Sequence, residues 1–425
     1  MLKLSAIILI LCLLIIWSNF AQSVEAPLIK NEPLSNNEPK EKHQTCGDSI
    51  EDIVELRFIQ IEQFISKVNQ YGNCGYRLTH VVRVMLGSDD RLEQMSFSGI
   101  LKKEENSQYE YAWFLATRPG EAQTLANNLA EKGFYFRESM SFVYGRCNTI
   151  AEKQKSENKD LGILSDIFNI KLGQMGSFFL FEKKVGNLKK NEYRILDARI
   201  TGKKGELEAN KKKMDDYIAK GFRPVDLWYI GEFNEHFVVM EKDESIKSEG
   251  DYIFVSSYYG MTKTLNEMAK KGYKLVLIGY AFALLNRIKV EPLHIEYDSF
   301  ETYKDVSKKS RQWEGRNLSY VATGISGYFI DCDPFDGNWF FSIATEKTTD
   351  KNKDILFLVR NDFIDEYFKK NGLNPTKKNP LTKEQIQEMD IEFNNELNRL
   401  FKEGYQIVNY GIPNAEVIMF ERPKD

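Results

Sequence analysis

The segment KEGYQIVNYG at residues 402–411 combines a basic helix end, a glycine, an aromatic residue and an alternating strand pattern. The same order recurs in AEKGFYFRES (130–139), AKGFRPVDLW (219–228) and KKGYKLVLIG (270–279), and more loosely in YGNCGYRLTH (71–80). Apolar residues stand seven and four positions before each aligned glycine, as they do on one face of a 3.6-residue helix. The pattern predicts one structural unit that the chain uses five times.

The aligned glycines are expected to end helices. A residue in the left-handed conformation reverses the chain after a helix, and glycine adopts this conformation without a Cβ penalty. The aromatic ring that follows would then fold back onto the apolar face of the helix. We therefore predict structural helix caps at Gly75, Gly133, Gly221, Gly272 and Gly404.

Strand patterns flank these helices. Apolar and aromatic residues at period two precede most of them, at 109–116, 191–200, 251–260 and 354–363. After the last helix, GYQIVNYG and AEVIMFERP are separated by turn-forming residues around Pro413. The unit is thus βαββ. The predicted fold class is α+β, with several βαββ-type modules whose antiparallel sheets are covered on one face by helices.

The last copy, LNRLFKEGYQIVNYGIPNAEVIMFERP at residues 397–423, resembles a family of small bacterial βαββ domains of unknown function. The signature of that family is a helix ending in AEGWELV, a strand, and a second strand ending in FKR. Gly404, Tyr405 and the closing residues 420–422 carry the likeness. Tyr or Phe replaces the Trp of the family, and no copy keeps the Glu that follows it. The resemblance implies a fold and no activity, because the family is itself functionally undefined.

The chain is expected to divide into lobes. Residues 46–150 hold two copies, residues 151–300 hold the third and fourth, and residues 301–425 hold a divergent segment plus the C-terminal βαββ copy. The charged stretch 151–160 is interpreted as a boundary or a long surface loop. A helix-like segment at 303–313 precedes Gly315, but basic residues occupy its apolar offsets, so it is not counted as a copy.

The first residues predict export. Lys3 precedes an apolar run at 4–17 and small residues that permit cleavage, so residues 1–23 are interpreted as a signal peptide and residues 24–45 as a disordered tether. Cleavage would leave 57 basic and 62 acidic residues, a net charge of about −5 (58 − 1 = 57). The alternative is an uncleaved membrane anchor, although the run is shorter than the ~20 apolar residues of a spanning helix.

Four cysteines remain after such cleavage, and an even number in an oxidising compartment favours disulfides. An apolar stripe predicts one helix across residues 49–71, about 33 Å long. The ends of that helix would be too far apart for a disulfide. We therefore expect the first two cysteines not to pair with each other. The candidates are Cys46, Cys74, Cys147 and Cys332.

Candidate metal ligands are few. The loop at 331–337 carries Asp331, Asp333 and Asp336, which could hold a hard cation such as calcium. Its spacing does not match an EF-hand, and a turn rich in Asp, Pro and Gly is the commoner explanation. His294 and Asp298 lie on one face of a predicted strand but about 13 Å apart, so ordinary strand amphipathicity is favoured over a metal triad.

The remaining histidines are given structural interpretations. His80 alternates with apolar residues in YRLTHVVRV, which indicates a buried or half-buried structural histidine. Glu235 and His236 lie between two strands, where a solvated turn is favoured over an acid/base pair. We therefore predict no catalytic residue, no cofactor-binding residue and no cofactor.

The sequence contains no phosphate loop, GxSxG elbow, HExxH or CxxC motif. The net charge is −4, and the basic run at 211–213 has acids close by, which disfavours nucleic acid as a partner. The favoured function is an exported, noncatalytic envelope protein, periplasmic or secreted, that acts as a binding or assembly scaffold for an unknown protein partner. Contact with a membrane is expected only if the N-terminal segment stays uncleaved. The alternative is a hydrolase or lyase with an unrecognised site between lobes, assisted by a cation.

Overall fold

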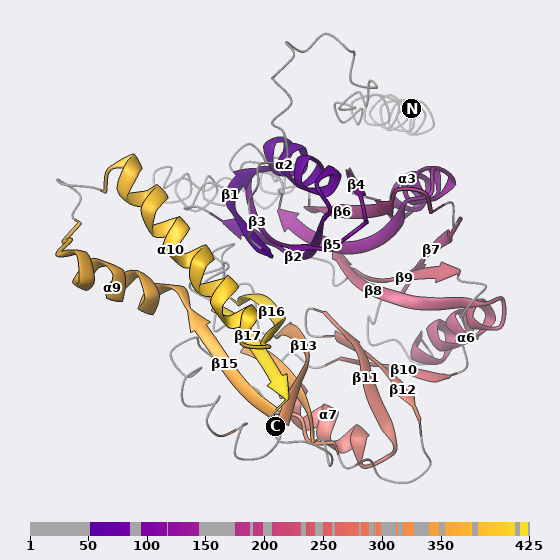
Figure 1. The fold of residues 1–425 in the computed structure, drawn as a ribbon. Helices are drawn as coiled ribbons and strands as arrows, with labels where there is room; N and C mark the ends of the chain where they lie inside the picture. The colour runs from indigo at the N-terminus through magenta and orange to yellow at the C-terminus, as the bar shows by residue number, and fades with distance from the viewer. Residues whose placement is uncertain are drawn as a thin grey trace, which may run out of the picture. The chain divides into compact units, whose positions relative to one another are not determined.

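The protein has an α+β fold built from several small antiparallel sheet modules. The computed structural model describes residues 52–85, 95–116, 118–143, 175–187, 190–198, 206–230, 235–242, 250–256, 260–279, 282–288, 293, 295–298, 312, 318–326, 340–347, 353–375, 381–412 and 417–423. Within these ranges there are five three-stranded sheets and one two-stranded sheet. Figure 1 shows their order along the chain.

The first unit shows the common plan. It consists of β1 (Ile53–Gln60), α2 (Ile61–Asn73), β2 (Tyr76–Met85) and β3 (Met95–Lys103). The strand order is β1-β3-β2, and β3 pairs antiparallel with both neighbours. The third strand of the unit is therefore central, while the two strands joined by the helix form the edges.

Four further units repeat this order. Unit two contains β4 (Tyr109–Ala116), α3 (Pro119–Glu131), β5 (Tyr135–Val143) and β6 (Met175–Lys184). Unit three contains β7 (Glu192–Asp197), α6 (Glu206–Ile218), β8 (Phe222–Ile230) and β9 (Glu235–Lys242). Unit four contains β10 (Asp251–Ser256), α7 (Met261–Ala269), β11 (Tyr273–Ile278) and β12 (Phe282–Arg287). The last unit contains β15 (Lys353–Val359), α9 (Arg360–Asn371), α10 (Lys383–Lys402), β16 (Gln406–Ile412) and β17 (Val417–Pro423).

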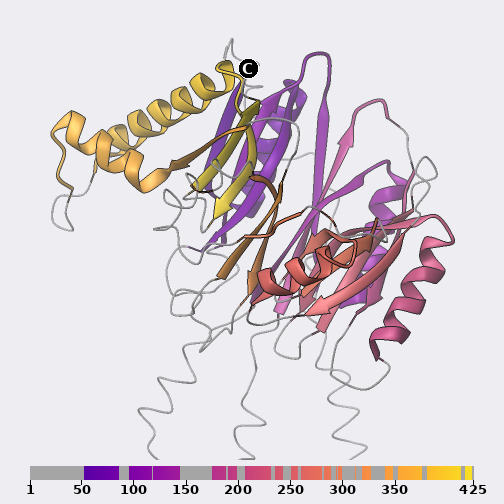
Figure 2. The same ribbon diagram turned by 90° about the horizontal axis from the view of Figure 1, so that it is seen from below.

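Two parts of the chain depart from the plan. The last unit has two helices where the others have one, and Lys370 of α9 pairs with Glu392 of α10 at 3.1 Å. Both helices can be followed in Figure 2. Between unit four and the last unit, β13 (Leu318–Ser326) and β14 (Phe340–Lys347) form an antiparallel pair. The predicted divergent segment therefore contains at least the strand pair of a unit.

Both faces of the central strands are covered. In β6, Phe179 and Phe181 pack against alanines of α3, the helix of the same unit. The alternating residues Phe178 and Leu180 belong to the core around α2, the helix of the preceding unit. This explains the unbroken apolar runs of these strands, which are typical of sheets buried on both sides. The prediction of helices on one face holds for each unit alone, and the neighbouring unit covers the second face.

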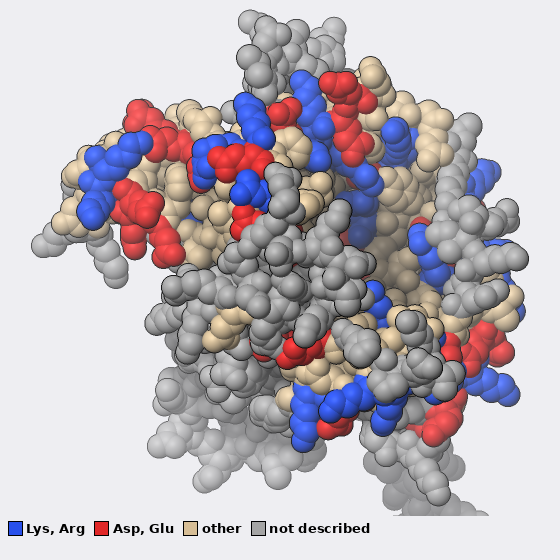
Figure 3. Space-filling model, turned by 60° about the horizontal axis from the view of Figure 1, so that its bottom comes forward, with Lys and Arg blue, Asp and Glu red and all other residues tan. Residues whose placement is uncertain are grey.

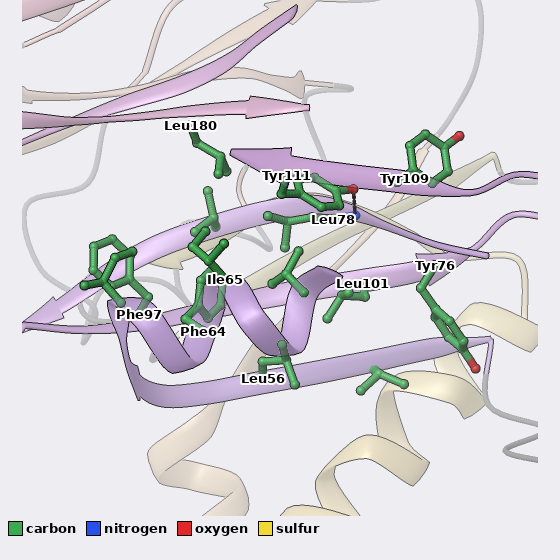
Figure 4. Close-up of a cluster of buried hydrophobic side chains, with 14 of the residues drawn as sticks. Leu56, Phe64, Ile65, Tyr76, Leu78, Phe97, Leu101, Tyr109, Tyr111 and Leu180 are labelled. Atoms are coloured by element: carbon green, nitrogen blue, oxygen red, sulfur yellow. Dashed lines mark hydrogen bonds between the residues drawn. The ribbon is translucent and has the colours of Figure 1, made fainter. Parts of the chain in front are cut away.

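The core around α2 illustrates the packing (Figure 4). Phe64 and Val68 of α2 are fully buried between residues of β3 and residues of unit two. The ring of Phe97 lies 4.9 Å from that of Phe178, centroid to centroid, so the two sheets meet through aromatic contacts. A helix thus forms one shared core with its own sheet and the next sheet.

The five predicted helix caps are confirmed. Their φ angles lie between +85° and +88°, in the left-handed region. The aromatic ring after the cap also folds back in the first and third copies. Tyr71 and Tyr76 meet edge to face at 5.4 Å, and so do Tyr217 and Phe222.

The single helix expected at 49–71 is wrong, because residues 53–60 form β1. Ile53 belongs to the core with the last unit, whereas Val54 and Leu56 belong to the core around α2. A strand buried on both faces carries closely spaced apolar residues, which resemble a helical stripe when they run into a real helix.

The start of β1 and the end of α2 bear on which cysteines can pair. The carbonyl of Asp52 accepts from Lys103 N–H, and the carbonyl of Gly75 accepts from Glu104 N–H. The start of β1 and the end of α2 therefore meet at the same end of β3. Cys46 stands only a few positions before Asp52 in the sequence, so distance no longer argues against its pairing with Cys74.

The expected lobe boundary at 150/151 lies inside unit two. Residues on both sides of the charged stretch 151–160 belong to one sheet, since β6 pairs with β4 and β5.

Among the helices that the structure describes, none is long and apolar enough to span a membrane.

We predict that Gly272→Val lowers the free energy of unfolding by about 1–3 kcal/mol, because a β-branched residue is strained at a φ of +88°. Chemical denaturation measures the change. The control is Gly120→Ala in α3, where an added Cβ would meet no atom within 4 Å. This control is expected to keep or slightly raise stability. Equal stability of Gly272→Val and the parent would contradict the cap assignment.

Candidate functional site at the junctions between units

At four junctions, an asparagine bonds both backbone groups of one residue in the next unit. Asn69 of α2 donates to the carbonyl of Tyr111 at 3.0 Å and accepts from its N–H at 2.7 Å. We call this arrangement an amide clamp. It recurs at the same position before the cap glycine in three other helices. The pairs are Asn127 with Tyr193, Asn266 with Tyr297, and Asn398 with Ile53.

The fourth of these clamps joins the two ends of the described chain. Asn398 lies in α10 of the last unit, and Ile53 lies in β1 of unit one. A second amide, Asn394, accepts from the N–H of Glu55 at 2.9 Å. The last helix therefore binds the first strand as the earlier helices bind the strands that follow them. We call this contact the closing junction.

The clamp at Tyr297 identifies a further junction. Tyr297 is buried and lies between unit four and β13, in a segment without regular secondary structure. Together with the β13–β14 pair, it places parts of a divergent additional unit in this region. The sequence pattern did not indicate a copy here, because basic residues interrupt the apolar stripe of the helix-like segment at 303–313.

Buried tyrosine hydroxyls form the second part of three of these junctions. The hydroxyl of Tyr111 accepts from Leu78 N–H at 2.7 Å, and that of Tyr193 accepts from Phe136 N–H at 2.7 Å. Tyr297 does the same with Leu275 at 2.9 Å. Each donor residue begins a register shift in its strand pairing. A bulge leaves an N–H without a strand partner, and the tyrosine of the next unit satisfies it.

Buried carboxylates complete these contacts. The hydroxyl of Tyr111 donates to Glu182 at 3.0 Å, and Glu182 also pairs with Arg77 of unit one at 2.9 Å. In unit three, Tyr193 donates to Glu241 at 2.8 Å. Burial raises the pKa of both tyrosine hydroxyls, so they stay neutral and can donate and accept at once. The buried charges are paired, as desolvated charges require.

The junction between units three and four lacks both devices. Asp215 stands where the clamp asparagine would stand, and a carboxylate cannot donate to a carbonyl. Pro224 stands where the bulge donor would stand and has no N–H. Lys211 instead links Asp215 at 3.0 Å to Asp251 of β10 at 2.9 Å. These side chains are partly exposed, so this junction relies on apolar packing and a solvated ion pair.

A row of polar residues follows the bulges of the second strands. The equivalent positions carry His80, Glu138, Asp226 and Asn409, while Leu277 takes this place in unit four. We call these four polar residues the bulge row. Asn409 is buried and His80 is half-buried, which confirms the structural interpretation of His80. Burial lowers the pKa of His80 to about 4, with a smaller effect of Arg137.

Glu138 and Asp226 bring two carboxyl groups from units two and three close together. Asp226 accepts from Ser139 N–H at 3.1 Å, from the Ser139 hydroxyl at 2.5 Å and from Leu227 N–H at 2.8 Å. Burial raises its pKa to about 6 despite these bonds. Burial, and then the charge of Asp226, raise the pKa of Glu138 to about 8. The two acids therefore differ in protonation near neutral pH.

Most of the predicted chemistry lies outside the described residues. Among the described residues, no group of three metal-ligating side chains could hold an ion. Cys74 is described and partly buried at the end of α2. The candidates outside the described residues are Asp331, Asp333, Asp336, Cys46, Cys147, Cys332 and His294.

The solvated turn expected at Glu235 and His236 is wrong. β9 begins at Glu235, and His236 is 5% exposed. Its ring lies 4.5 Å from that of Phe282 in unit four. The sequence interpretation extended the turn through His236, whereas β9 already begins at Glu235.

The functional residues that sequence reasoning missed are the clamp asparagines. An alignment on the cap glycines places Asn69, Asn127, Asn266 and Asn398 in one column, with Asp215 as the exception. That column was a usable signal. The bulge row gives no comparable signal, because its members share polarity but not residue type.

Comparisons with known proteins found no match. No family model matches the chain, and neither a curated protein nor a solved structure resembles it significantly.

We expect Asn127→Asp to lower the thermal midpoint, because aspartate keeps the acceptor but loses the donor to the carbonyl of Tyr193. An unsatisfied buried carbonyl costs about 1–3 kcal/mol. The matched control is Asp215→Asn, the reverse change at the junction without a clamp. It removes only a partly exposed ion pair and should leave the midpoint unchanged or raised. A midpoint that falls equally in both variants would contradict the clamp.

Glu138→Gln tests the raised pKa of this acid. An acid whose pKa is higher in the folded chain binds protons more tightly there, so its ionisation opposes folding as the pH rises. For Glu138 this loss of stability spans the pH range from 4.5 to about 8. The variant is therefore expected to gain thermal stability over the parent as the pH rises through this range, with the largest gain above it. Melting curves at several pH values measure this, and a constant difference would refute the shift.

Proposed function

We propose that this protein is an exported, noncatalytic scaffold of the bacterial envelope whose βαββ units form surfaces for binding or assembly. The last unit resembles a family of small bacterial domains, and the other units repeat its βαββ plan. A scaffold needs units held in fixed relation, and the junctions supply that relation. The partner is proposed to be a protein.

The observation that carries this proposal is the use of the buried polar groups. The clamp amides and the tyrosine hydroxyls bind groups of a neighbouring unit, and so do the buried Glu182 and Glu55. An active site usually keeps such groups available to a substrate. Here they are consumed by contacts between units, which supports a structural role for most of the polar interior.

The surface supports a protein partner and disfavours nucleic acid. Figure 3 shows acidic and basic side chains interspersed over one face, with several Lys and Arg at the border of a hollow. A nucleic-acid surface is expected to carry one dominant positive field. Mixed charges are typical of surfaces that select a protein by complementarity.

We also propose that the exported chain forms disulfides. Cys74 ends α2 near the start of β1, and a secreted location would favour its oxidation. Cys46 stands only a few positions before β1, so the partner of Cys74 is open among Cys46, Cys147 and Cys332. Peptide mapping without reduction identifies the pair. A Cys74 peptide found only as a free thiol in protein from the native envelope would contradict this proposal.

The second candidate function is a hydrolase or lyase with a site between units. Glu138 and Asp226 favour it, because two acids with separated pKa values are the pattern of a general acid beside a general base. Asp331, Asp333 and Asp336 would bind the cation in this alternative. The bonds from Ser139 and Leu227 to Asp226 weigh against it, since they occupy the base.

A crosslinking experiment separates the two functions. The tagged chain is recovered from its own cells after crosslinking, beside Glu138→Gln and a tag-only control. A scaffold should recover the same enriched protein in equal yield with the parent and with Glu138→Gln, and the purified pair should re-form. No protein enriched over the tag-only control would contradict the scaffold. A hydrolytic activity that Glu138→Gln abolishes would favour the enzyme.

Intact-mass measurement of the native protein tests export. We expect the mass of the chain without residues 1–23, recovered from the periplasm or the medium. A full-length mass in the membrane fraction would instead support an uncleaved anchor. Recovery of the full-length chain from the cytoplasm would contradict export altogether.

A further inference from the structure

The closing junction is the one junction that chain connectivity does not enforce. Asn398 and Ile53 are separated by 345 positions, whereas Asn69 and Tyr111 are separated by 42. The other junctions join units that follow one another along the chain, so each can form as soon as the next unit folds. The closing junction requires the two ends of the chain to find each other.

Charged groups make this junction specific. Glu55 of β1 accepts from the hydroxyl of Tyr410 at 2.8 Å and pairs with Arg360 of α9. The side chains of Glu55 and Arg360 are 2% and 4% exposed. Arg360 also lies over the ring of Phe393, at 3.6 Å from its centroid. Arg57 reaches Asp390 of α10 at 3.1 Å.

The same junction is less well satisfied than the amide clamps. Arg57 and Arg360 share Glu55, and burial together with the charge of Arg360 lowers the pKa of Arg57. Among the described residues, the buried Nε of Arg360 has no hydrogen-bond acceptor. Burying two guanidinium groups beside one carboxylate costs more desolvation free energy than burying the neutral clamp at Tyr193.

The two surfaces of the closing junction are different and complementary, so they form a heterologous contact. A heterologous contact made within one chain can also be made between two copies. Within one chain it is favoured only by the effective concentration of the two ends. We propose that the closing junction exchanges between two copies of this chain, so that α9 and α10 of each copy bind β1 of the other. This inference rests on the assembly role proposed above and names a second copy as a partner.

A charge-swap pair of full-length variants tests the exchange. Glu55→Arg places arginines at positions 55, 57 and 360 together, and Arg360→Glu places glutamates at positions 55 and 360 together. Neither variant should therefore form the closing junction within one chain or between two identical copies. In an equal mixture, the arginine introduced at position 55 of one chain faces the glutamate introduced at position 360 of the other, and the native pair forms at the second junction. Light scattering and native mass spectrometry should show each variant alone as a monomer and the mixture as a twofold heavier heterodimer.

The double variant E55R/R360E is the control for tolerance of both substitutions. It should fold and remain a monomer at low concentration, because the reversed pair closes within one chain. A mixture that stays monomeric while the double variant folds would overturn the proposal.

A second measurement covers single variants that fail to fold. Unlabelled and isotope-labelled parent chains are mixed at high concentration, held, and diluted for native mass spectrometry. Mixed-label dimers that appear only after the hold at high concentration and persist on dilution would support exchange. Their absence at every concentration would overturn it. Neither result depends on recovery of an external partner, so failure here and failure of the scaffold proposal can be told apart.

Discussion

The structure depends on the bond between a side-chain amide of one helix and the backbone of the next sheet's first strand. That strand is an edge of its sheet, because the order within each unit places the third strand in the centre. An exposed edge offers unpaired N–H and C=O groups to other chains. Asn69 supplies at Tyr111 the donor and acceptor that a neighbouring strand would supply. The same contact therefore protects the edge and sets the position of the next unit.

Helix position follows from this bond. A helix that reaches the next strand must lie between two sheets, and its apolar face then contributes to a core that both share. Met214 of α6 packs with Val238 of unit three and Phe282 of unit four in one cluster. The central strands are apolar on both faces for the same reason. Packing and the amide clamp are thus two parts of one arrangement, and each unit is completed by its neighbours.

The repeated unit could be predicted from the sequence because its signals are local. The cap glycines need only a helix, a reversal and a strand, and their positive φ angles follow from that short segment. β1 could not be predicted in this way. Its apolar residues are divided between two cores, one of which involves residues more than 300 positions away, and a single-sequence pattern cannot distinguish this from a helical stripe.

The candidate site shows a similar division. The clamp asparagines occupy one aligned column, so the sequence contains them, although their partners become visible only in three dimensions. The raised pKa of Glu138 depends first on its burial, directly after a register shift in the strand pairing, and then on the charge of Asp226 in another unit. Neither feature has a sequence signature, since bulges depend on strand pairing.

The junction between units three and four shows that the departures from the common plan are matched to each other. Pro224 removes a bulge N–H that would otherwise need the hydroxyl of a tyrosine, while Asp215 removes the donor of the clamp. Together they leave an apolar contact that Lys211 and Asp251 bridge at its edge. Salt screens an exposed ion pair more than a buried amide bond. The units are therefore joined by contacts of unequal character, with neutral clamps at four junctions and a solvated charge pair at this one.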